Sequence, residues 1–479
     1  MDDLDPLQRE AVLAVDDAAT KFLIVTGGPG TGKTRVLRDV VERLQTRHKL
    51  DVVALAPTGE AANVMQSALG ALVRTTTVAM FLSDAALVRR ARKRRSAIVI
   101  DEASMVSLVM LDAVMDAMAV GPCHNDDESD VERELGNDED ATLASRFILV
   151  GDCDQLEPVC APPVLPALLR ASDLIPGMRV IKLTRVFRQG EGTASITRAL
   201  AALRQPRDIR LQDLVPASGD DDGAFFIVVD DRFATRDAAV EFVQKAYDAL
   251  EIDALGGRVG EDANASASAK EEIPTLAMRV LCFSVETRRT LNLAVQERRM
   301  GFGGDAFLNR ARYPDIKIGD LVRCVRNLHE DAIKDDGGGK RKRRGPKRRI
   351  VTNGAIGVVR VGGGEPRVVY NVVDDRGQRA TWTDRMKGDG SFASVFELGA
   401  YASTVHSAQG NEADVVIGLL DSAAFVRAAR RLMYTLVSRA KKQVVVGCTR
   451  AALDIVLRAP PVCRATELLV CDAAAATSL

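Results

Sequence analysis

The sequence has few aromatic residues, few histidines and no cysteine pair with metal-binding spacing. Aromatic side chains make up 4% of its 479 residues, and it contains one tryptophan and four histidines. None of the eight cysteines forms a C-x-x-C pair, so the sequence gives no support for a zinc site. Cysteines scattered through a chain with a large core are typical of reduced thiols in an intracellular compartment.

Long apolar runs are missing as well. No uncharged apolar stretch reaches the roughly 18 residues that a membrane-spanning helix needs. The acidic first residues lack the basic start and apolar core of a secretory signal. We therefore expect an intracellular protein that has no membrane partner.

Neither sign of charge dominates the chain. It contains 65 lysines and arginines and 66 aspartates and glutamates, which gives a formal net charge of −1. This balance excludes a globally basic protein that coats nucleic acid, so any nucleic-acid binding must depend on local patches. With 47% apolar and 27% charged residues, the composition is that of a globular chain. Its length allows about three domains.

Short apolar runs that alternate with helical segments predict an α/β fold in the first part of the chain. In such folds the carboxyl ends of the parallel strands share one edge of the sheet, and ligands bind there. Because polar clusters follow the predicted strand ends, we expect the site at this edge. The predicted strands are residues 21–26, 51–56, 97–100 and 147–150, and the predicted helices are residues 34–45 and 60–71.

The pattern restarts after residue 205 and indicates a second α/β domain. Strands are predicted at residues 225–229, 279–283, 414–417 and 443–446, and a helix at residues 234–250. Between them, short Val/Ile runs alternate with glycines and charges, which predicts a small inserted antiparallel β-barrel. The expected organisation is a first domain at residues 1–205, a second domain at residues 206–304 and 396–479, and the barrel at residues 305–395.

Two segments are distinguished by their charge. Residues 121–145 contain a strongly acidic insertion, which we expect to form a solvated surface loop. The segment from Lys340 to Arg349 (KRKRRGPKRR) is strongly basic. It has three open interpretations: a nuclear-import signal, a nucleic-acid contact or a solvated insertion. The nucleus is thus a possible location, and the cytoplasm is the alternative.

Residues 27–34 (GGPGTGKT) match G-x-x-x-x-G-K-[ST] between a predicted strand and a predicted helix. Backbone N–H groups of such a loop turn toward phosphates, and the helix N-terminus adds a positive field. Lys33 can reach the β- and γ-phosphates of ATP, and the Thr34 hydroxyl can hold Mg²⁺. A chance glycine-rich turn is the alternative, and the context on both sides opposes it. The ATP-binding residues expected here are Gly28, Pro29, Gly30, Thr31, Gly32, Lys33, Thr34 and Arg35.

Asp101 and Glu102 follow the third predicted strand. A carboxylate at this strand end can hold Mg²⁺ through water, and the adjacent Glu102 can take a proton from the attacking water. The alternative is a helix N-terminus that is capped by acids. The preceding P-loop favours the catalytic interpretation.

Residues 151–159 (GDCDQLEPV) follow the fourth predicted strand, where Gln155 is placed to orient the attacking water or to sense the γ-phosphate. The run resembles the G-D-x-x-Q-L-x-P-V motif of superfamily 1 helicases, which is far more specific than a P-loop. Further motifs follow in the family's order over most of the chain. The set is similar to the RecD/Dda-like branch, superfamily 1B, in which an AAA-type P-loop domain is combined with a UvrD-like C-terminal domain.

The resemblance assigns further residues to the ATP site. Residues 4–8 (LDPLQ) look like the adenine-reading motif, which maps to Gln8, and residues 183–189 (LTRVFRQ) resemble the motif whose Arg188 contacts the γ-phosphate. Residues 434–441 (YTLVSRAK) resemble the final motif, whose arginine maps to Arg439. Residues 404–412 (TVHSAQGNE) are similar to T-x-H-x-x-Q-G-x-E. Residues 317–320 with 353–359 look like the inserted barrel. The ATP-site residues carried over from residues 404–412 are Gln409, Gly410 and Glu412.

The resemblance also suggests DNA contacts, mostly to phosphates and therefore insensitive to sequence. Residues 56–62 look like the first DNA motif, with Pro57 and Thr58, and residues 76–81 loosely resemble the second, with Thr77. Phe81 is expected either to stack on a base or to be a core residue. His406 is expected either to contact DNA or to be a packed core histidine.

The family implies ATP-driven movement along single-stranded DNA from 5′ to 3′, with ATP and Mg²⁺ as cofactors. ATP is expected in a cleft between two RecA-like domains, with Arg439 supplied by the second. The expected partners are single-stranded and tailed duplex DNA, and the chain is expected to act as a monomer. Thr34 and Asp101 are the expected metal ligands. The expected catalytic residues are Lys33, Asp101, Glu102, Gln155, Arg188 and Arg439.

Two departures from the family concern unwinding. Ser407 stands where a lysine often follows the histidine, and the strand-splitting pin of this branch has only residues 83–96 available. These arginine-rich residues predict either a short pin or a basic helix end. An ATP-driven translocase that does not unwind DNA alone is therefore an alternative to a helicase.

Three other functions are weaker alternatives. An RNA-directed superfamily 1 helicase is opposed by the missing zinc-rich N-terminal module and by the barrel signature. A P-loop scaffold without catalysis predicts the loss of Glu102, Gln155 or Arg439, and all three are present. A simple P-loop phosphotransferase predicts no second α/β domain and neither Gln409 nor Arg439.

Overall fold

The chain divides into two compact units in the computed structural model, residues 1–188 with 462–479 and residues 189–461. Each unit contains its own parallel sheet, so the α/β class with two parallel-sheet domains is confirmed. Among the described helices, none is long and apolar enough to cross a membrane. The structure describes residues 3–70, 72–93, 96–118, 146–158, 161–187, 193–215, 223–250, 278–300, 319–325, 328–330, 348–351, 355–362, 365–373, 379–383, 396–398, 400–420 and 429–458.

Several features expected from the sequence lie outside the described residues. They are Arg188, the acidic insertion at residues 121–145, residues 340–347 of the basic segment, and residues 317–318 and 353–354 of the barrel signature. Their expected roles stay predictions.

The first unit is built on a six-stranded parallel sheet with the order β3-β2-β4-β5-β1-β6. The strand that precedes the P-loop, β1, lies between β5 and β6, and every neighbouring pair runs parallel. The carboxyl ends of all six strands therefore lie at one edge. The strands are β1 (Phe22–Gly27), β2 (Val52–Ala56), β3 (Thr75–Thr77), β4 (Ala97–Ile100), β5 (Phe147–Gly151) and β6 (Met178–Leu183).

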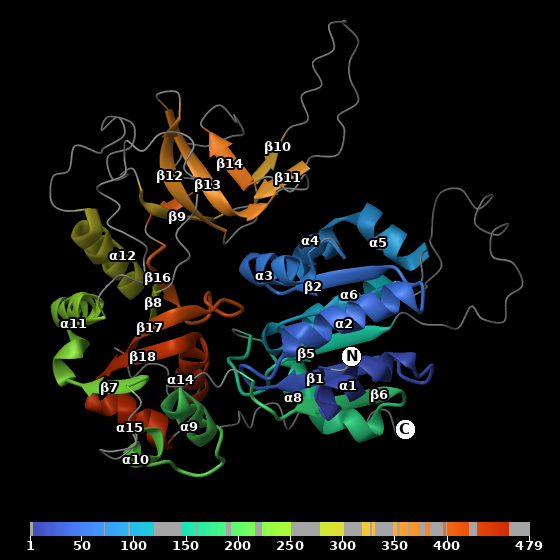
Figure 1. The fold of residues 1–479 in the computed structure, drawn as a ribbon, viewed down its shortest axis with the longest axis horizontal. Coiled ribbons are helices and arrows are strands. Elements are labelled where there is room, and N and C mark those ends of the chain that lie inside the picture. Colours follow the sequence, from blue (N-terminus) through green and yellow to red (C-terminus); the bar gives the residue numbers. More distant parts are fainter. Residues whose placement is uncertain are drawn as a thin grey trace, which may run out of the picture. The chain divides into compact units, whose positions relative to one another are not determined.

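Helices cover both faces of this sheet (Figure 1), because successive strand residues point to opposite sides. In β1, Leu23 and Val25 join one hydrophobic cluster, whereas Ile24 joins the other. Helices α1 (Pro6–Leu13), α2 (Lys33–Thr46) and α3 (Gly59–Leu69) contribute to the first cluster. The elements that contribute to the second are α4 (Val78–Ser83), α5 (Ala85–Lys93), η2 (Ala103–Met105), α6 (Leu108–Met118) and α8 (Val164–Ala171). The short helices η1 (Ala14–Asp16) and η3 (Ser172–Leu174) complete the unit.

The second unit is built on a five-stranded parallel sheet with the order β16-β8-β17-β18-β7. Close packing on this sheet requires glycine: a Cβ on Gly418 would lie 2.6 Å from Leu436 of α14. The strands are β7 (Phe225–Val229), β8 (Met278–Cys282), β16 (Ala402–Thr404), β17 (Ala413–Leu420) and β18 (Ala440–Cys448). The helices are α9 (Ala194–Leu203), α10 (Leu211–Leu214), η4 (Asp231–Ala234), α11 (Arg236–Ala249), α12 (Val285–Met300), α14 (Ala429–Ser438) and α15 (Arg450–Arg458).

The segment inserted into the second unit is antiparallel, but its described strands form an open sheet with the order β14-β13-β12-β9-β15. Closure into the expected barrel would require pairing between the outer strands, and none exists among the described residues. The last strand lies beyond the expected end at residue 395. The strands are β9 (Leu321–Cys324), β12 (Ile356–Gly362), β13 (Glu365–Val373), β14 (Arg379–Thr383) and β15 (Phe396–Leu398), with a separate pair β10 (Leu328–Glu330) and β11 (Arg348–Val351).

The boundary between the units falls after Arg188, whereas the sequence suggests residue 205. The reason is a buried arginine, Arg430 of α14, which is 1% exposed. Its guanidinium donates hydrogen bonds of 2.9 Å to the carbonyls of both Gln205 and Arg207. Because this contact joins the segment after α9 to α14, residues 193–207 belong with the second sheet.

Candidate nucleotide site and nucleic-acid contacts

The P-loop connects β1 to α2 in the first unit, as expected. Gly30 and Gly32 have φ angles of 73° and 81°, which residues with a side chain rarely adopt. The Lys33 Nζ atom donates hydrogen bonds to the carbonyls of Gly27 and Gly28, at 2.8 and 2.9 Å. Its ammonium group is therefore at the centre of the loop, where phosphate groups bind in such turns.

Two neighbouring segments hold the outer side of this loop. The Gln8 Nε2 atom donates a hydrogen bond of 3.0 Å to the Thr31 carbonyl, and the Phe187 N–H donates one of 2.8 Å to the Gly30 carbonyl. These two hydrogen bonds fix the backbone of the loop at Gly30 and Thr31. Gln8 is 2% exposed, and the expected adenine contact stays a prediction.

Thr34 and Arg35 begin α2 and are both exposed. Arg35 forms an exposed ion pair of 3.8 Å with Asp3. The hydroxyl of Thr34 is a hard oxygen donor of the kind that Mg²⁺ prefers.

Asp101 and Glu102 follow β4, which is separated from β1 by β5. The N–H of Glu102 donates a hydrogen bond of 2.8 Å to Asp101 Oδ1. Burial, and then the charge of Glu102, raise the pKa of Asp101 to about 7, while the charge of Lys33 opposes the rise. Glu102 has a φ of 50°, a left-handed conformation that costs a non-glycine residue about 1–2 kcal/mol. Such strain is common at functional sites.

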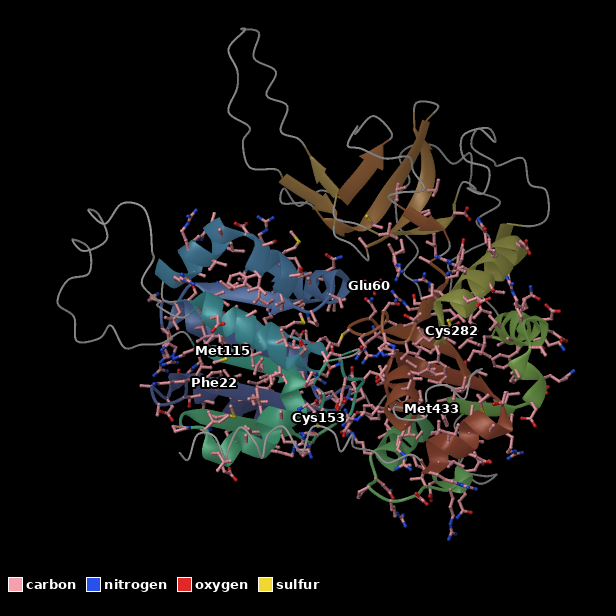
Figure 2. The ribbon with its side chains drawn as sticks, turned by 180° about the vertical axis from the view of Figure 1, so that it is seen from behind. Phe22, Glu60, Met115, Cys153, Cys282 and Met433 are labelled. Atoms are coloured by element: carbon pink, nitrogen blue, oxygen red, sulfur yellow. The ribbon has the colours of Figure 1, made fainter. Side chains whose placement is uncertain are left out.

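The loop after β5 brings Gln155 to the same edge of the sheet. Gln155 is 3% exposed, and its Nε2 atom donates a long hydrogen bond of 3.4 Å to Asp152 Oδ2. A Cβ on Gly151 would lie 3.1 Å from the backbone nitrogens of Ala103 and Ser104, so the loop packs directly on η2. Figure 2 shows Cys153 of this loop at the edge opposite Phe22, the first residue of β1. Burial raises the pKa of the Cys153 thiol.

The candidate DNA-contacting threonines lie on neighbouring strand ends. Ala56, at the end of β2, pairs with Thr77, at the end of β3. The Thr58 hydroxyl accepts a hydrogen bond from the Ala61 N–H, and the Thr77 hydroxyl accepts one from the Met80 N–H, both at 3.2 Å. Each threonine therefore caps the N-terminus of a helix, which is an environment suited to phosphate.

Phe81 corrects one expectation. It is 0% exposed and belongs to the hydrophobic cluster on the α4–α6 face of the first sheet. A fully buried ring offers no face to a base, so the core interpretation holds and the stacking role is wrong. Pro57, in contrast, is half-buried at the end of β2.

In the second unit, the candidate residues after β16 form a tight turn. His406 is half-buried, and burial lowers the pKa of its imidazole. Its carbonyl accepts a hydrogen bond from the N–H of Gln409, which is 0% exposed. Gly410 has a φ of 84°, and Glu412 forms an ion pair of 3.8 Å with Lys441.

Arg439 follows α14 and is 4% exposed. Its Nε and one terminal nitrogen donate to the Ser438 hydroxyl, at 3.1 and 2.9 Å. Among the described residues, these neutral contacts are its only side-chain hydrogen bonds. A buried guanidinium held by a neutral hydroxyl keeps its charge available for an anion.

Sequence reasoning missed Phe187. Its side chain is 45% exposed, and the Arg185 guanidinium lies 4.9 Å from its ring centroid. A Cβ on Gly32 would lie 3.9 Å from the ring, so an exposed aromatic face adjoins the P-loop. The signal in the sequence was its position directly before Arg188.

The first parallel sheet carries a P-loop and an acidic pair at its carboxyl edge, and the unit built on the second sheet carries a buried arginine. Together these features define a nucleotide-binding protein with two RecA-like domains. The AAA domain family matches residues 8–161, and the UvrD-like helicase C-terminal domain family matches residues 399–447. The chain is thus similar to RecD-type helicases, with an AAA domain match near one end and a UvrD-like helicase domain match near the other.

Curated relatives agree with this family. The ATP-dependent RecD2 DNA helicase of Deinococcus radiodurans is 26% identical over 476 residues, which cover 97% of this chain and 52% of the relative. The RecBCD enzyme subunit RecD of Mycobacterium tuberculosis is 29% identical over 223 residues, or 41% of this chain and 34% of the relative. The chain thus spans about half of the first relative, and the match to the second spans about a third of it.

Solved structures share the fold. The structure of Pif1 helicase from Bacteroides in complex with ADP-AlF3 and single-stranded DNA has a TM-score of 0.50 and 16% identity, covering 99% of this chain and 97% of that one. A structure of two coordinating Pif1 helicases at forked duplex DNA also has a TM-score of 0.50, with 15% identity, covering 92% of this chain and 91% of that one.

Proposed function

We propose that this chain hydrolyses ATP with Mg²⁺ and uses the energy to move from 5′ to 3′ along single-stranded DNA, opening tailed duplexes. The observation that carries the proposal is the convergence of Lys33, Asp101 and Gln155 at the carboxyl edge of the first sheet. The 5′ to 3′ direction follows from the family. The Deinococcus radiodurans relative is named as a DNA helicase, and the Bacteroides Pif1 neighbour was solved with single-stranded DNA.

The first unit carries the chemistry of hydrolysis. Lys33 and the loop N–H groups bind the phosphates, and Gln155 orients the attacking water. Glu102 accepts the proton of that water. The donors suit a hard cation, because the Thr34 hydroxyl and the carboxylate of Asp101 are oxygen ligands and Asp101 is half-buried next to a second acid, Glu102. When bound, Mg²⁺ neutralises the charge that develops on the phosphates.

The second unit supplies Arg439 to the γ-phosphate in this proposal. The buried guanidinium contacts only the neutral Ser438 hydroxyl among the described residues, so no acid competes for it. An arginine of this kind contributes about 10³–10⁵ in rate to related reactions. If Arg439 contacts the γ-phosphate only before hydrolysis, each hydrolysis event would change how the two units bind the DNA strand.

The base of ATP is proposed to stack on Phe187. The exposed ring adjoins Gly32, and Arg185 lies over it. Aromatic stacking needs no base-specific hydrogen bond, and Gln8 lies beside the same glycine, 2.4 Å from the position of a Cβ. DNA phosphates are proposed to bind at the capped helix starts of Thr58 and Thr77, beside Pro57, and at His406.

A second candidate, a translocase that needs a partner to unwind, is favoured by one observation. The described residues between Thr77 and Ala97 form α4 and α5, with no strand pair among them. Arg89 and Arg90 of α5 are exposed, and Arg90 pairs with Asp51 at the start of the sheet's strands. This arrangement supports the basic helix end over a β-hairpin pin.

Unwinding of two tailed duplexes tests the proposal. One duplex carries a 5′ single-stranded tail and the other a 3′ tail, and Lys33→Ala is the inactive control. We expect ATP-dependent opening of the 5′-tailed duplex alone. Opening of neither duplex, with hydrolysis still stimulated by single-stranded DNA, would select the translocase. An ATP hydrolysis rate that is the same with and without single-stranded DNA would contradict both candidates.

A further inference from the structure

Three buried side-chain atoms in the described part of the first unit have no hydrogen-bond partner. They are Oγ of Ser96, Oγ of Ser104 and Oε1 of Gln155. The three residues are 0%, 2% and 3% exposed, respectively. A buried polar atom without a partner lowers stability. An alanine at position 104 would avoid this cost, so the retention of a hydroxyl there calls for a functional reason.

Ser104 packs on Gly151, and Gln155 lies four residues further along the same loop. Strands β4 and β5 are parallel neighbours that pair Ile100 with Leu149, so the segments that follow them leave the sheet side by side. The backbone nitrogen of Ser104 lies 3.1 Å from the position of a Cβ on Gly151. Gln155 folds back onto Asp152, the residue after Gly151. Ser96, in contrast, precedes β4 at the opposite edge of the sheet.

The two polar atoms have complementary chemistry. A serine hydroxyl can donate a hydrogen bond, whereas the Oε1 atom of glutamine can only accept one. The one side-chain hydrogen bond that holds the Gln155 amide, to Asp152, is 3.4 Å long, close to the limit of a hydrogen bond. A rotation of the Gln155 side chain therefore breaks little and gives Oε1 access to a donor on η2.

We propose that Ser104 is a positioning residue for the γ-phosphate sensor. In the ATP-bound state its hydroxyl donates a hydrogen bond to Oε1 of Gln155. This bond fixes the amide plane and directs Nε2 away from Ser104, toward the γ-phosphate and the attacking water. The inference rests on the proposed ATP hydrolysis, and it makes η2 the link between Glu102 and Gln155.

Steady-state ATP hydrolysis with saturating single-stranded DNA tests this role. The variants are Ser104→Ala, Gln155→Ala and the double variant, with Ser96→Ala as a matched buried serine. We expect Ser104→Ala to lower kcat about fivefold, as for the loss of one hydrogen bond, with the KM for ATP unchanged. In the Gln155→Ala background, Ser104→Ala should have no further effect, because the two residues act as one unit. Ser96→Ala should match the wild type.

Thermal unfolding separates a catalytic effect from a structural one. Ser104→Ala removes a polar atom that has no partner among the described residues, so we expect an unchanged or raised Tm. A Tm lowered by several degrees would make the hydroxyl structural and overturn the proposal. So would an unchanged kcat, or equal effects of Ser104→Ala in the wild-type and Gln155→Ala backgrounds. If the wild type does not hydrolyse ATP, both the proposed function and this inference fail. If the wild type hydrolyses ATP and Ser104→Ala does so with the same kcat, only this inference fails.

Discussion

The side-chain amide of Gln8 is bonded to the backbone carbonyl of Thr31 over 3.0 Å, so the first helix of the chain holds the P-loop in place. The contact depends on Gly32, because a Cβ there would lie 2.4 Å from Gln8 Nε2. Gln8 also completes a capping box with Asp5 at the start of α1. The same glutamine thus completes the capping box of α1 and supports the P-loop.

Gln8→Ala is expected to raise the KM for ATP by about fivefold, because the loop loses one hydrogen bond. The KM for GTP distinguishes two roles. If Gln8 supports only the loop, both KM values rise together. If it also reads adenine, the variant loses its preference for ATP over GTP.

Lys33→Ala is expected to lower ATP hydrolysis at least about 100-fold, because the charge that stabilises the developing phosphate charge is removed. The far-UV circular dichroism spectrum should stay unchanged. Lys21→Ala, an exposed lysine before β1, is the control for loss of a positive charge. Normal turnover by Lys33→Ala would contradict the site assignment.

Phe187→Ala is expected to raise the KM for ATP about tenfold through loss of stacking on the base. Inhibition by tripolyphosphate, which has no base, should be unaffected. Phe187→Tyr keeps an aromatic face and should behave as wild type. Equal weakening of ATP and tripolyphosphate would instead assign Phe187 to loop support through the packing of its ring beside Gly32.

Asp16 joins η1 to the end of α2 through a cluster of cations. It pairs with Arg43 in a short contact, with Arg47 at 3.4 Å and with His48 at 2.9 Å. The hydrogen bonds with Arg43 and His48, together with the charges of Arg43 and Arg47, hold the pKa of Asp16 well below its ordinary value. A lowered pKa gives stability that is fully present above the unfolded pKa of about 4 and is lost as the pH falls below it.

Asp16→Asn should therefore lower the free energy of unfolding by about 1–3 kcal/mol at pH 7. The difference from the wild type should shrink as the pH falls from 4 to 3, because Asp16 takes up a proton in the unfolded chain while it stays ionised in the folded one. Urea unfolding at pH 7, 5, 4 and 3 measures it. A difference that stays constant across these pH values would show that the carboxylate charge is not responsible.

Arg430→Met should destabilise the second unit by about 3 kcal/mol, because four backbone carbonyls lose hydrogen bonds from a buried, charged donor. The guanidinium bonds the carbonyls of Val456 and Leu457 as well as those of Gln205 and Arg207. Arg431→Met, at a half-buried position next along the helix, is the control. Equal urea midpoints for the two variants would contradict this role.

The strands that sequence reasoning found are mainly those in sheet interiors. Buried parallel strands are continuous apolar runs, as in β4 and β5, and their positions were predicted closely. In the two parallel sheets, the strands it missed, β3, β6 and β16, all lie at sheet edges. An edge strand buries less of its surface, so its sequence can be short and polar, as in the Thr75–Thr77 strand.

The sequence by itself determined the nucleotide chemistry of this protein, because a phosphate loop and its acidic partner need fixed residue types at fixed positions along strand ends. Only the tertiary structure decided which residues meet. Pairing of Ala56 with Thr77 brings two helix starts together, and the packing of Gly151 on η2 brings the loop of Gln155 against the segment of Ser104. The tertiary structure also buries Phe81 and leaves Phe187 exposed. Such outcomes depend on strand order and on helix packing, which join residues far apart in the chain and leave no local pattern in the sequence.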